Sequence, residues 1–445
     1  MVKLIGKLSH FSSAHVLVVG DLMLDTYTTG KVKRISPEAP VSVLHVEKEE
    51  SRPGGAGNVV LNLISLGAKV SAVGRIGFDE AGEKIFSELE REGVNTTGLF
   101  REKGYRTPVK NRLIADAQQV LRVDSETISS LAEDLEQRIV EKLPALLETV
   151  QIIAVSDYGK GFLSRSLLMT LFELAKARNI PVIVDPKGDD FSKYQGATVL
   201  KPNLSEAYTA AKLPRETSLD QVAAKILQSC YVDMLLITRG EQGISLFGRK
   251  GDRFDFPVRS KEVKDVTGAG DTALAMISMA LANNLDIKDA AQLANIAAGI
   301  AIERLGCARI CLADMATRLL EFDVENKIFD EEHLFALKEA LKGKRFVILG
   351  LESGSGMSNL VFRTIRKLSG KGEQRKLIVY VRDNDPDEEF VSLLSSLADI
   401  DFIVLKCESL KNLCEIIQPE AVYTIEKSKL LTLDHHVALL EPVKN

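Results

Sequence analysis

The chain has 445 residues and a formal net charge of −5, with 45% hydrophobic and 27% charged residues. This composition is typical of a globular protein with a sizeable core, arranged as two or three domains or as one large α/β domain. The negative net charge gives no general attraction to nucleic acid or to an anionic membrane surface, so neither is expected as a partner.

The cysteines and the N-terminus give no sign of secretion. The five cysteines are scattered, and Cys307 and Cys311 have no nearby histidine or second cysteine pair to complete a metal site. We therefore expect unreactive thiols in a reducing compartment. The opening residues MVKLIGKLSHFSS lack the apolar core of a secretion signal, and no run reaches the ~18 apolar residues of a membrane helix. A cytoplasmic protein is predicted.

Short β-branched runs alternate with helical patterns along the chain. The first are a predicted strand at 15–21, a helix at 58–68, a strand at 69–77 and a helix at 79–93. Further strands, each ending in a polar or glycine-containing turn, are predicted at 152–159, 180–188, 197–203 and 233–243. This alternation predicts βαβ units and a mostly parallel sheet flanked by helices, with ligands bound outside the carboxyl ends of the strands.

Two further features complete the predicted architecture. The more polar strands near 41–50 and 105–124 fit poorly into a buried parallel sheet, and we expect them to pair as a small antiparallel flap over the site. The charged stretch VENKIFDEEH precedes a new series of strands at 346–351, 377–381 and 401–406. We therefore expect one domain over 1–325 and a small Rossmann-like α/β domain over 326–445.

The stretch DVTGAGDTAL (265–274) places glycines and one aspartate at the start of an apolar helix. A helix start offers unpaired N–H groups and a positive dipole end, and glycines let this backbone approach an anion. Gly268, Ala269 and Gly270 would form the anion cradle, and Asp271 would accept a proton from an attacking hydroxyl. This equipment suits phosphoryl transfer. The alternative is a glycine turn with Asp271 as a helix cap, and the stretch alone does not decide.

Two other polar turns favour a nucleotide site. KPNLSE places Asn203 and Glu206 three residues apart after a strand, where they could hold the water shell of Mg²⁺ or simply cap a helix. TRGEQG places Thr238, Gly240 and Gly243 at another strand end, open to nucleotide phosphates. The chain has no Walker motif GxxxxGK[ST], so a P-loop is not supported.

The motifs GDLMLD, RPGGAGN, KPNLSE, TRGEQG and DVTGAGD occur in the order seen in ribokinase-like carbohydrate kinases. Over about residues 10–320, the chain resembles most closely the kinase half of the bifunctional heptose-phosphate kinase/adenylyltransferases that make ADP-heptose. The stretches GDLMLDTYTTGKVKRISPEAPVSV, VSDYGKG and VDPKGDDFSKYQGATVLKPNLSE carry this likeness. It implies a ribokinase-like fold with a lid at 31–50 and 105–124, ATP and Mg²⁺ as cofactors, and phosphorylation of the anomeric oxygen of D-glycero-D-manno-heptose 7-phosphate.

The resemblance also implies a role for each motif position. Asp271 would be the base, with the backbone of residues 268–271 as the anion hole. ATP and Mg²⁺ would be held by Asn203 and Glu206, the metal through water, and the nucleotide phosphates by Thr238, Gly240 and Gly243. Asn295 would line the adenine pocket, although a core-facing asparagine is equally consistent. The sugar hydroxyls would be held by Asp25, Gly54, Gly55 and Asn58.

A substrate that already carries a phosphate requires cations near the sugar. The candidates are Arg34, Lys110, Arg112, Arg122, Lys160 and Lys187. The sequence does not rank them, because a solvated charge on the lid or surface explains each one as well.

In the bifunctional enzymes the kinase is followed by a nucleotidyltransferase domain with an HxGH signature. The corresponding stretch here, FVILGLESGSGMSNLVFRTIRKL, contains no histidine, and His435 and His436 come too late in the pattern to replace it. Gly354, Ser355 and Gly356 could still form a phosphate-binding turn. We expect the adenylyl transfer to be lost, with this domain kept for dimerisation or stability in a homodimer.

The sequence is also consistent with two other functions. The chain could phosphorylate another sugar phosphate or a nucleoside, since the lid charges set that choice. It could also be a non-catalytic sugar-phosphate sensor, although a sensor has no need of a base, an anion hole and metal-binding residues together.

Overall fold

The computed structural model describes residues 2–9, 11–116, 118–258, 263–322, 327–329, 334–369, 375–383, 385–405, 410–426 and 429–433. The chain divides into two compact units, a larger one of residues 12–311 and a smaller one that combines residues 1–11 with 312–445. The segment after residue 311 thus groups with the smaller unit, ahead of the domain boundary expected at residue 325. That boundary stays a prediction.

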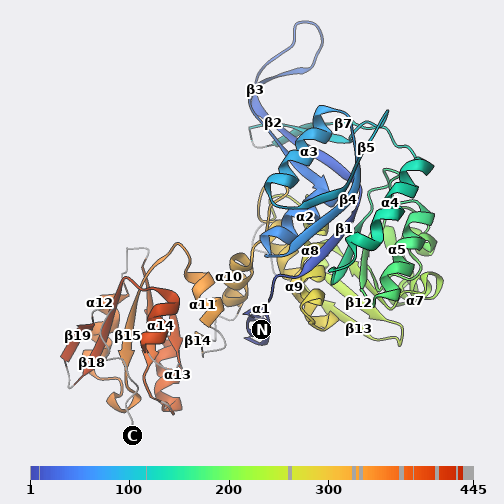
Figure 1. The fold of residues 1–445 in the computed structure, drawn as a ribbon. Coiled ribbons are helices and arrows are strands. Elements are labelled where there is room, and N and C mark those ends of the chain that lie inside the picture. The colour runs from blue at the N-terminus through green and yellow to red at the C-terminus, as the bar shows by residue number, and fades with distance from the viewer. Residues whose placement is uncertain are drawn as a thin grey trace. The chain divides into compact units, whose positions relative to one another are not determined.

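Nine strands among the described residues of the larger unit form one sheet, in the order β13-β12-β11-β10-β9-β8-β1-β4-β5 (Figure 1). The pairs from β11 to β5 are parallel, whereas β11, β12 and β13 pair antiparallel. The strands are β1 (His15–Gly20), β4 (Lys69–Gly77), β5 (Asn95–Glu102), β8 (Ile152–Ser156), β9 (Val182–Asp185), β10 (Val199–Leu200), β11 (Met234–Thr238), β12 (Ile244–Gly248) and β13 (Arg253–Phe256). The predicted mostly parallel sheet is confirmed.

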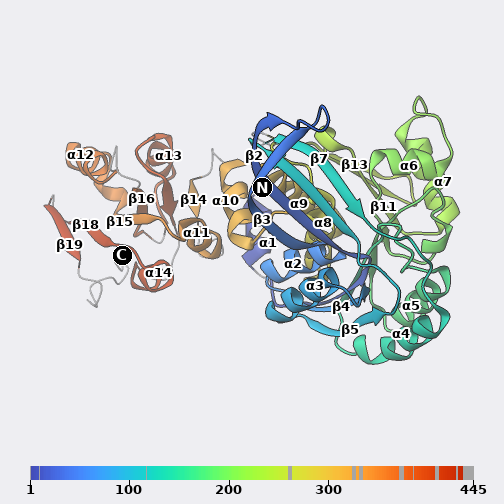
Figure 2. The same cartoon turned by 90° about the horizontal axis from the view of Figure 1, so that it is seen from above.

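Helices cover both faces of this sheet (Figure 2). One group packs together on the face where α8 contacts β1, β8 and β9: α2 (Ala56–Ser65), α3 (Glu80–Arg91), α8 (Ala269–Ala282) and α9 (Ile287–Ala301). The other group shares a core with the opposite face: α4 (Glu133–Leu146), α5 (Arg165–Ala177) and α7 (Leu219–Cys230). The short α6 (Leu204–Ala211) follows β10, and the 3₁₀ turns η1 (Ser192–Tyr194) and η2 (Gly240–Gln242) complete the unit.

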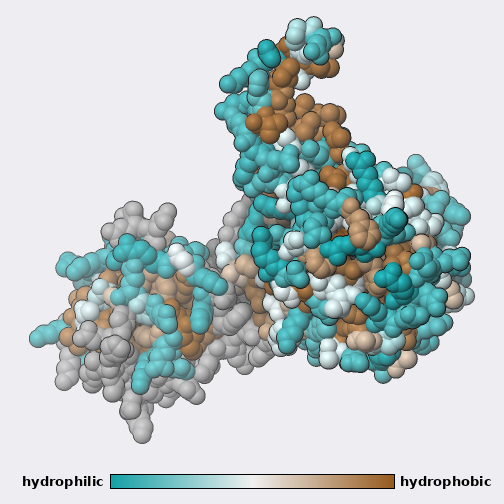
Figure 3. Space-filling view, turned by 45° about the horizontal axis from the view of Figure 1, so that its top comes forward, coloured by the Kyte–Doolittle hydropathy of each residue, from teal (hydrophilic) through white to brown (hydrophobic). Residues whose placement is uncertain are grey.

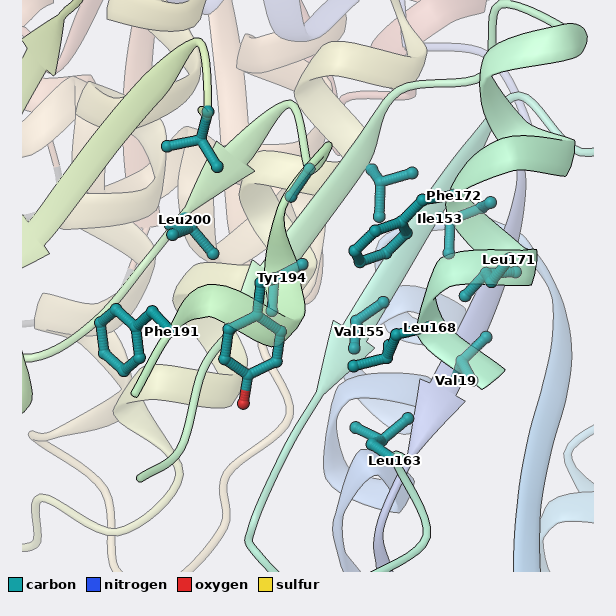
Figure 4. Close-up of a cluster of buried hydrophobic side chains, with 14 of the residues drawn as sticks. Val19, Ile153, Val155, Leu163, Leu168, Leu171, Phe172, Phe191, Tyr194 and Leu200 are labelled. Atoms are coloured by element: carbon teal, nitrogen blue, oxygen red, sulfur yellow. The ribbon is translucent and has the colours of Figure 1, made fainter. Parts of the chain in front are cut away.

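The core under α5 shows why this sheet is stable. Figure 4 shows Leu168 and Phe172 of α5 beside Val155 and Ile153 of β8, and all four side chains are buried. Each such side chain stabilises the fold by roughly 1.5–3 kcal/mol when it is buried. Because these strands are covered on both faces, their sequences are continuous runs of apolar, mostly β-branched residues. This is the pattern from which the strands were predicted.

A separate four-stranded sheet, in the order β3-β2-β6-β7, forms the lid. Its strands are β2 (Leu22–Ile35), β3 (Ser42–Gly55), β6 (Val109–Ala115) and β7 (Gln118–Ser125). The β2–β3 hairpin projects well beyond the main sheet (Figure 1). A lid was predicted, but not its full extent, because β2 begins at residue 22 and β3 continues to the sugar-site glycines.

The prediction that the lid is wholly antiparallel is wrong. β2 pairs with β3 and β6 with β7 in antiparallel fashion, but β2 and β6 pair in parallel. The reason is the connection: β2 and β6 are joined through β3, α2, β4, α3 and β5, and no tight turn sets their direction.

The smaller unit has its own mostly parallel sheet, in the order β14-β17-β16-β15-β18-β19, with only β18 and β19 antiparallel among the described pairs. Its strands are β14 (Ile328–Phe329), β15 (Arg345–Leu351), β16 (Arg375–Val381), β17 (Phe402–Val404), β18 (Ala421–Glu426) and β19 (Lys429–Leu433). Its helices are α1 (Val2–Ser9), α10 (Leu312–Phe322), α11 (Leu334–Leu341), α12 (Asn359–Leu368), α13 (Glu388–Ser396) and α14 (Leu410–Ile417).

Two apolar cores, one with α11 and α14 and the other with α12 and α13, cover the two faces of this sheet. The predicted small α/β region with a parallel sheet is therefore confirmed. Across both units, no helix in the described parts of the chain has the length and apolar character needed to cross a membrane.

Candidate active site

Asp271 lies in the first turn of α8, at the carboxyl ends of the central strands of the larger unit. Gly268 is the N-cap residue and adopts a left-handed conformation with φ 80°, and no side chain caps the helix. Asp271 is buried at 3% exposure, and most of the helix behind it is buried as well. The alternative role of Asp271 as a helix cap does not fit this geometry, since its carboxylate accepts its hydrogen bonds from elsewhere.

Two neutral donors hold the carboxylate of Asp271. The Tyr158 hydroxyl donates to Oδ1 at 2.7 Å, and the Asn58 side-chain amide donates to Oδ2 at 2.8 Å. Burial raises the pKa of Asp271 to about 7, while these two hydrogen bonds act in the opposite direction. A carboxylate that titrates near neutral pH suits a general base, and its ionised, active fraction rises as the pH rises through about 7.

Gly268, in the turn ahead of Asp271, occupies a position that only glycine fits. A Cβ on Gly268 would lie 2.8 Å from Asn58 Nδ2, and the positive φ would strain any other residue. A Cβ on Gly270 would lie 3.7 Å from both Lys201 Nζ and Asp185 Oδ2. The backbone N–H groups at this helix start therefore lie beside a buried ion pair.

The ion pair between Lys201 and Asp185 was not predicted from the sequence. Lys201 is only 2% exposed, and its Nζ lies 2.8 Å from Asp185 Oδ2. Buried lysines are rare unless they are paired. The available signal was the position of Lys201 and Asp185 at the ends of two neighbouring predicted strands. A cation here can stabilise negative charge on a phosphoryl group at the glycine turn.

Asn203 and Glu206 form a complete capping box at the start of α6. The Asn203 side chain accepts from the Glu206 N–H at 2.9 Å, and the Glu206 carboxylate accepts from the Asn203 N–H at 3.0 Å. The alternative prediction, that these two residues cap a helix, is thus confirmed. The other Glu206 oxygen lies 2.7 Å from Lys187 Nζ. Lys187 therefore lies beside the start of α6 and not on the lid.

The same residues suit a hydrated Mg²⁺. The charge of Glu206 contributes to raising the pKa of Asp185, after the larger effect of burial, so the two carboxylates repel each other. A divalent cation that keeps most of its water and takes one or two carboxylates would relieve this repulsion. Within the described residues, no cluster of three His, Cys, Asp or Glu side chains forms a direct metal site.

Four of the residues predicted for ATP and the first residues of α8 line one pocket of about 330 Å³, whereas Asn203 and Glu206 are not among its lining residues. The pocket is bordered by Thr238, Gly240, Gly243, Asn295, Ala269 and Gly270, and by apolar residues such as Val258, Val266 and Ile302. Asn295 also donates its side-chain N–H to the Pro257 carbonyl at 2.9 Å, so it both lines this pocket and holds the backbone beside it. An apolar cleft that ends in glycines and a helix start fits a nucleotide with its phosphates inward.

The predicted sugar residue Asn58 contacts Asp271 directly. Asp25 is buried, and Arg112 Nη1 lies 2.6 Å from its Oδ1. A Cβ on Gly54 would lie 1.9 Å from Asp25 Oδ2, so this glycine lets β3 pass beside the carboxylate. Asn58, predicted to bind the sugar, donates a side-chain N–H to Asp271, and its role toward the sugar stays a prediction. Cys307, which was not singled out for the site, is a buried thiol with its Sγ 3.8 Å from Asp25 Oδ2.

The candidate cations for a substrate phosphate differ in their partners. Arg112 pairs with Asp25, Arg122 with Asp124, and Lys160 with Glu126 at 2.6 Å. Arg34 is exposed on the β2–β3 hairpin. Lys110 has no carboxylate partner among the described residues, and its Nζ lies 5.5 Å from the centre of the Tyr158 ring. Burial, followed by the nearby charge of Lys160, lowers the pKa of Lys110.

In the smaller unit, charged side chains gather at the carboxyl ends of the central strands. Arg382 lies 3.0 Å from Glu426 and 3.5 Å from Glu352, and the Ser353 N–H donates to Asp383 at 2.6 Å. Ser353–Ser355 forms a 3₁₀ turn that ends at Gly356. His435 and His436 lie outside the described residues.

The larger fold and its site define an ATP-dependent carbohydrate kinase. Residues 13–314 match the pfkB family of carbohydrate kinases, and the chain belongs to this family. It is 40% identical over 419 residues to the bifunctional protein HldE of Trichlorobacter lovleyi, covering 88% of this chain and 84% of the relative. It is 38% identical over 445 residues to the bifunctional protein HldE of Geobacter sulfurreducens, covering 92% and 87%.

Solved structures share the fold of the larger unit. Phosphofructokinase-2 from Escherichia coli, in complex with potassium, is 20% identical with a TM-score of 0.57 and covers 68% of this chain and 97% of its own. Arabidopsis thaliana ribokinase, complexed with ribose and ATP, is 19% identical with a TM-score of 0.54 and covers 69% and 99%. The predicted family and the ribokinase-like fold are thus confirmed, and the heptose-phosphate kinase role is supported in general.

Proposed function

We propose that this kinase transfers the γ-phosphoryl group of ATP to the anomeric hydroxyl of D-glycero-D-manno-heptose 7-phosphate. The product is the 1,7-bisphosphate, on the route to ADP-heptose and the lipopolysaccharide core, and we place the reaction in the cytoplasm. The observation that carries this proposal is the buried Asp271 carboxylate in the first turn of α8, where Ala269 and Gly270 line the nucleotide pocket and Asn58 and Tyr158 donate to the carboxylate. The resemblance of the lid and sugar motifs to the heptose kinases gives the substrate.

The geometry supports a separate role for each group in the phosphoryl transfer. The acceptor hydroxyl gives its proton to Asp271 while its oxygen bonds to the γ-phosphorus, and ADP leaves with the electron pair of the broken P–O bond. The N–H groups at the start of α8 and the Lys201 ammonium would stabilise the charge on the transferred group. Asn203, Glu206 and Asp185 would hold Mg²⁺, which supplies charge neutralisation at the nucleotide phosphates.

We also propose a ranking of the cations for the substrate phosphate. Lys110 is half-buried on the lid strand β6, next to Asp25 of β2 in register, and it has no carboxylate partner among the residues described. A buried ammonium that lacks a partner favours an incoming anion. We therefore assign the distal phosphate to Lys110 first, with Lys160 as second cation after it leaves Glu126.

We further propose a homodimer formed through the outer face of the lid, meaning the face with Leu44, Val46, Leu113, Leu121 and Val123. These residues share one side of the lid because side chains alternate along paired strands. Val46, Leu121 and Val123 are 58%, 54% and 44% exposed. Figure 3 shows hydrophobic side chains gathered on the lid. An apolar sheet face of this kind favours contact with a second copy.

The proposed kinase reaction is tested with purified protein, ATP, Mg²⁺ and the heptose 7-phosphate, followed by ³¹P NMR and an ADP assay. We expect the 1,7-bisphosphate and ADP in equal amounts. Other sugar phosphates and nucleosides, compared by kcat/KM, test the alternative acceptors. Binding of the heptose 7-phosphate with no ADP release would instead favour a sensor.

A further inference from the structure

Tyr158 follows β8 in the stretch SDYGKG, and no role was predicted for it from the sequence. Its hydroxyl reaches the proposed base directly, with 2.7 Å between its oxygen and Asp271 Oδ1. Burial, followed by the charges of Asp271 and Asp185, raises the pKa of Tyr158 well above its usual value. The phenol therefore keeps its proton at any working pH and acts as a donor toward the carboxylate.

The second donor to the base has its orientation fixed as well. Asn62, one turn along α2, donates to Asn58 Oδ1 at 3.2 Å and to the Asn58 carbonyl at 3.0 Å. Since Asn58 Oδ1 is the acceptor in this contact, its Nδ2 must be the atom that faces Asp271 Oδ2. The two carboxylate oxygens thus accept from two different elements, α2 and the loop after β8.

The loop that carries Tyr158 is itself held in place. The Tyr158 and Lys160 N–H groups both donate to Asp21 Oδ2, at 2.9 and 3.0 Å. Asp157 accepts from the Gly159 N–H at 2.7 Å. A Cβ on Gly55 would lie 3.4 Å from Tyr158 Cδ2, so the ring lies against the backbone at the end of β3. The hydroxyl is therefore aimed by a rigid backbone.

We propose that Tyr158 is a positioning residue for the phosphoryl transfer: its hydroxyl fixes the rotation of the Asp271 carboxylate and favours the ionised form of that group. The inference rests on the proposed role of Asp271 as the base. With each carboxylate oxygen holding one neutral donor, a free lone pair remains for the acceptor hydroxyl. The proton that moves is the one from the acceptor, which ends on Asp271, while Tyr158 keeps its own.

Several other charged or titratable groups act on the same carboxylate. Those facing Asp271 or the Tyr158 ring are Asp185 from β9, Lys201 after β10, Cys307 and Lys110 from β6. None of them is changed when the Tyr158 hydroxyl alone is removed. A shift in the pH profile of Tyr158→Phe therefore reports on the Tyr158–Asp271 hydrogen bond.

The test compares Tyr158→Phe with wild type in kcat and kcat/KM for the sugar phosphate between pH 5.5 and 9. Removing a donor to a carboxylate should lower kcat about tenfold or more, and should move the acid limb of the profile up by about one pH unit. KM should change much less than kcat. Tyr208→Phe is the matched control, because its part-buried hydroxyl donates to the Thr217 carbonyl, and its pH profile should stay that of wild type.

A second variant keeps the test decisive if Tyr158→Phe is poorly folded. Replacing Tyr158 by 3-fluorotyrosine retains the ring and strengthens the donor, so the acid limb should move to lower pH. Profiles that do not move in either variant would overturn the proposal. If Asp271→Asn abolishes turnover while both profiles stay unmoved, only the role of Tyr158 is wrong. If Asp271→Asn retains turnover, the proposed base itself is wrong.

Discussion

Lys110 is the residue on which recognition of a phosphorylated acceptor depends in this account. Replacing it by methionine keeps the apolar stem and removes the charge. We expect KM for the heptose 7-phosphate to rise roughly 10- to 100-fold, as for a lost charge-assisted contact, with a smaller change in kcat. The measurement is a steady-state titration of the sugar phosphate at saturating ATP.

The control for Lys110 lies on the same lid. Lys31 is exposed and paired with Glu47 at 3.1 Å, so Lys31→Met should leave KM unchanged. If Lys110→Met had the KM of wild type and Lys160→Met did not, the order of the two cations would be reversed.

Single residues also show which parts of the site could be predicted from the sequence. Asp271 and the nucleotide glycines could be placed because each follows a predicted strand or begins a predicted helix. The partners of Asp271 could not, since Tyr158 and Asn58 lie 113 and 213 residues away in the chain. The Lys201–Asp185 pair stayed hidden for the same reason: the sequence shows a lysine, but only the fold shows that it is buried.

Among the elements, the lid presents two chemically different faces, because side chains alternate along its strands. Asp25 and Tyr27 of β2 share the inner face with Lys110 and Arg112 of β6, as the register Asp25–Lys110 and Tyr27–Arg112 shows. The outer face carries the apolar residues named above. The sequence predicted a polar lid but did not separate these faces, because the pairing of β2 with β6 was unknown.

The outer face makes a prediction about assembly. Leu121→Asp combined with Val123→Asp places two charges on the proposed contact, so the homodimer should dissociate to monomers in sedimentation velocity at micromolar concentration. Tyr231→Asp is the control: Tyr231 is 64% exposed at the end of α7, outside the lid, and its variant should keep the state of wild type. An unchanged dimer in the double variant would exclude this face as the interface.

The whole molecule joins a kinase unit to a second α/β unit. The curated relatives matched over about nine-tenths of the chain are named bifunctional proteins. At the strand ends of the smaller unit, however, Arg382 is engaged with Glu352 and Glu426, and the stretch after β15 has no histidine. We propose that adenylyl transfer is lost in this unit and that its fold supports assembly or stability.

The measurement is incubation of the full chain with heptose 1-phosphate, ATP and Mg²⁺, with detection of pyrophosphate and ADP-heptose. We expect neither product above background, because no histidine at the expected position stabilises the leaving phosphates. The Trichlorobacter lovleyi relative assayed in parallel provides the comparison. Formation of ADP-heptose at a comparable rate would show that another set of residues carries the reaction.

The division of the chain was only partly visible in the sequence. The strand series after residue 345 indicated a second α/β unit, and the sheet confirms it. The N-terminal helix α1 packs with α10 and α11 of the smaller unit. The eight residues of α1 contain no local pattern that could predict this contact, which is made with residues about 300 positions further along the chain.

The central claim is that Asp271 takes the proton of the acceptor hydroxyl, and Asp271→Asn tests it most directly. The variant keeps the size of the side chain but has no basic carboxylate. At saturating ATP and heptose 7-phosphate, kcat should fall by about 10²–10⁴-fold, while ATP binding measured by calorimetry stays close to wild type. Turnover within a few-fold of wild type, with the variant folded, would contradict the account.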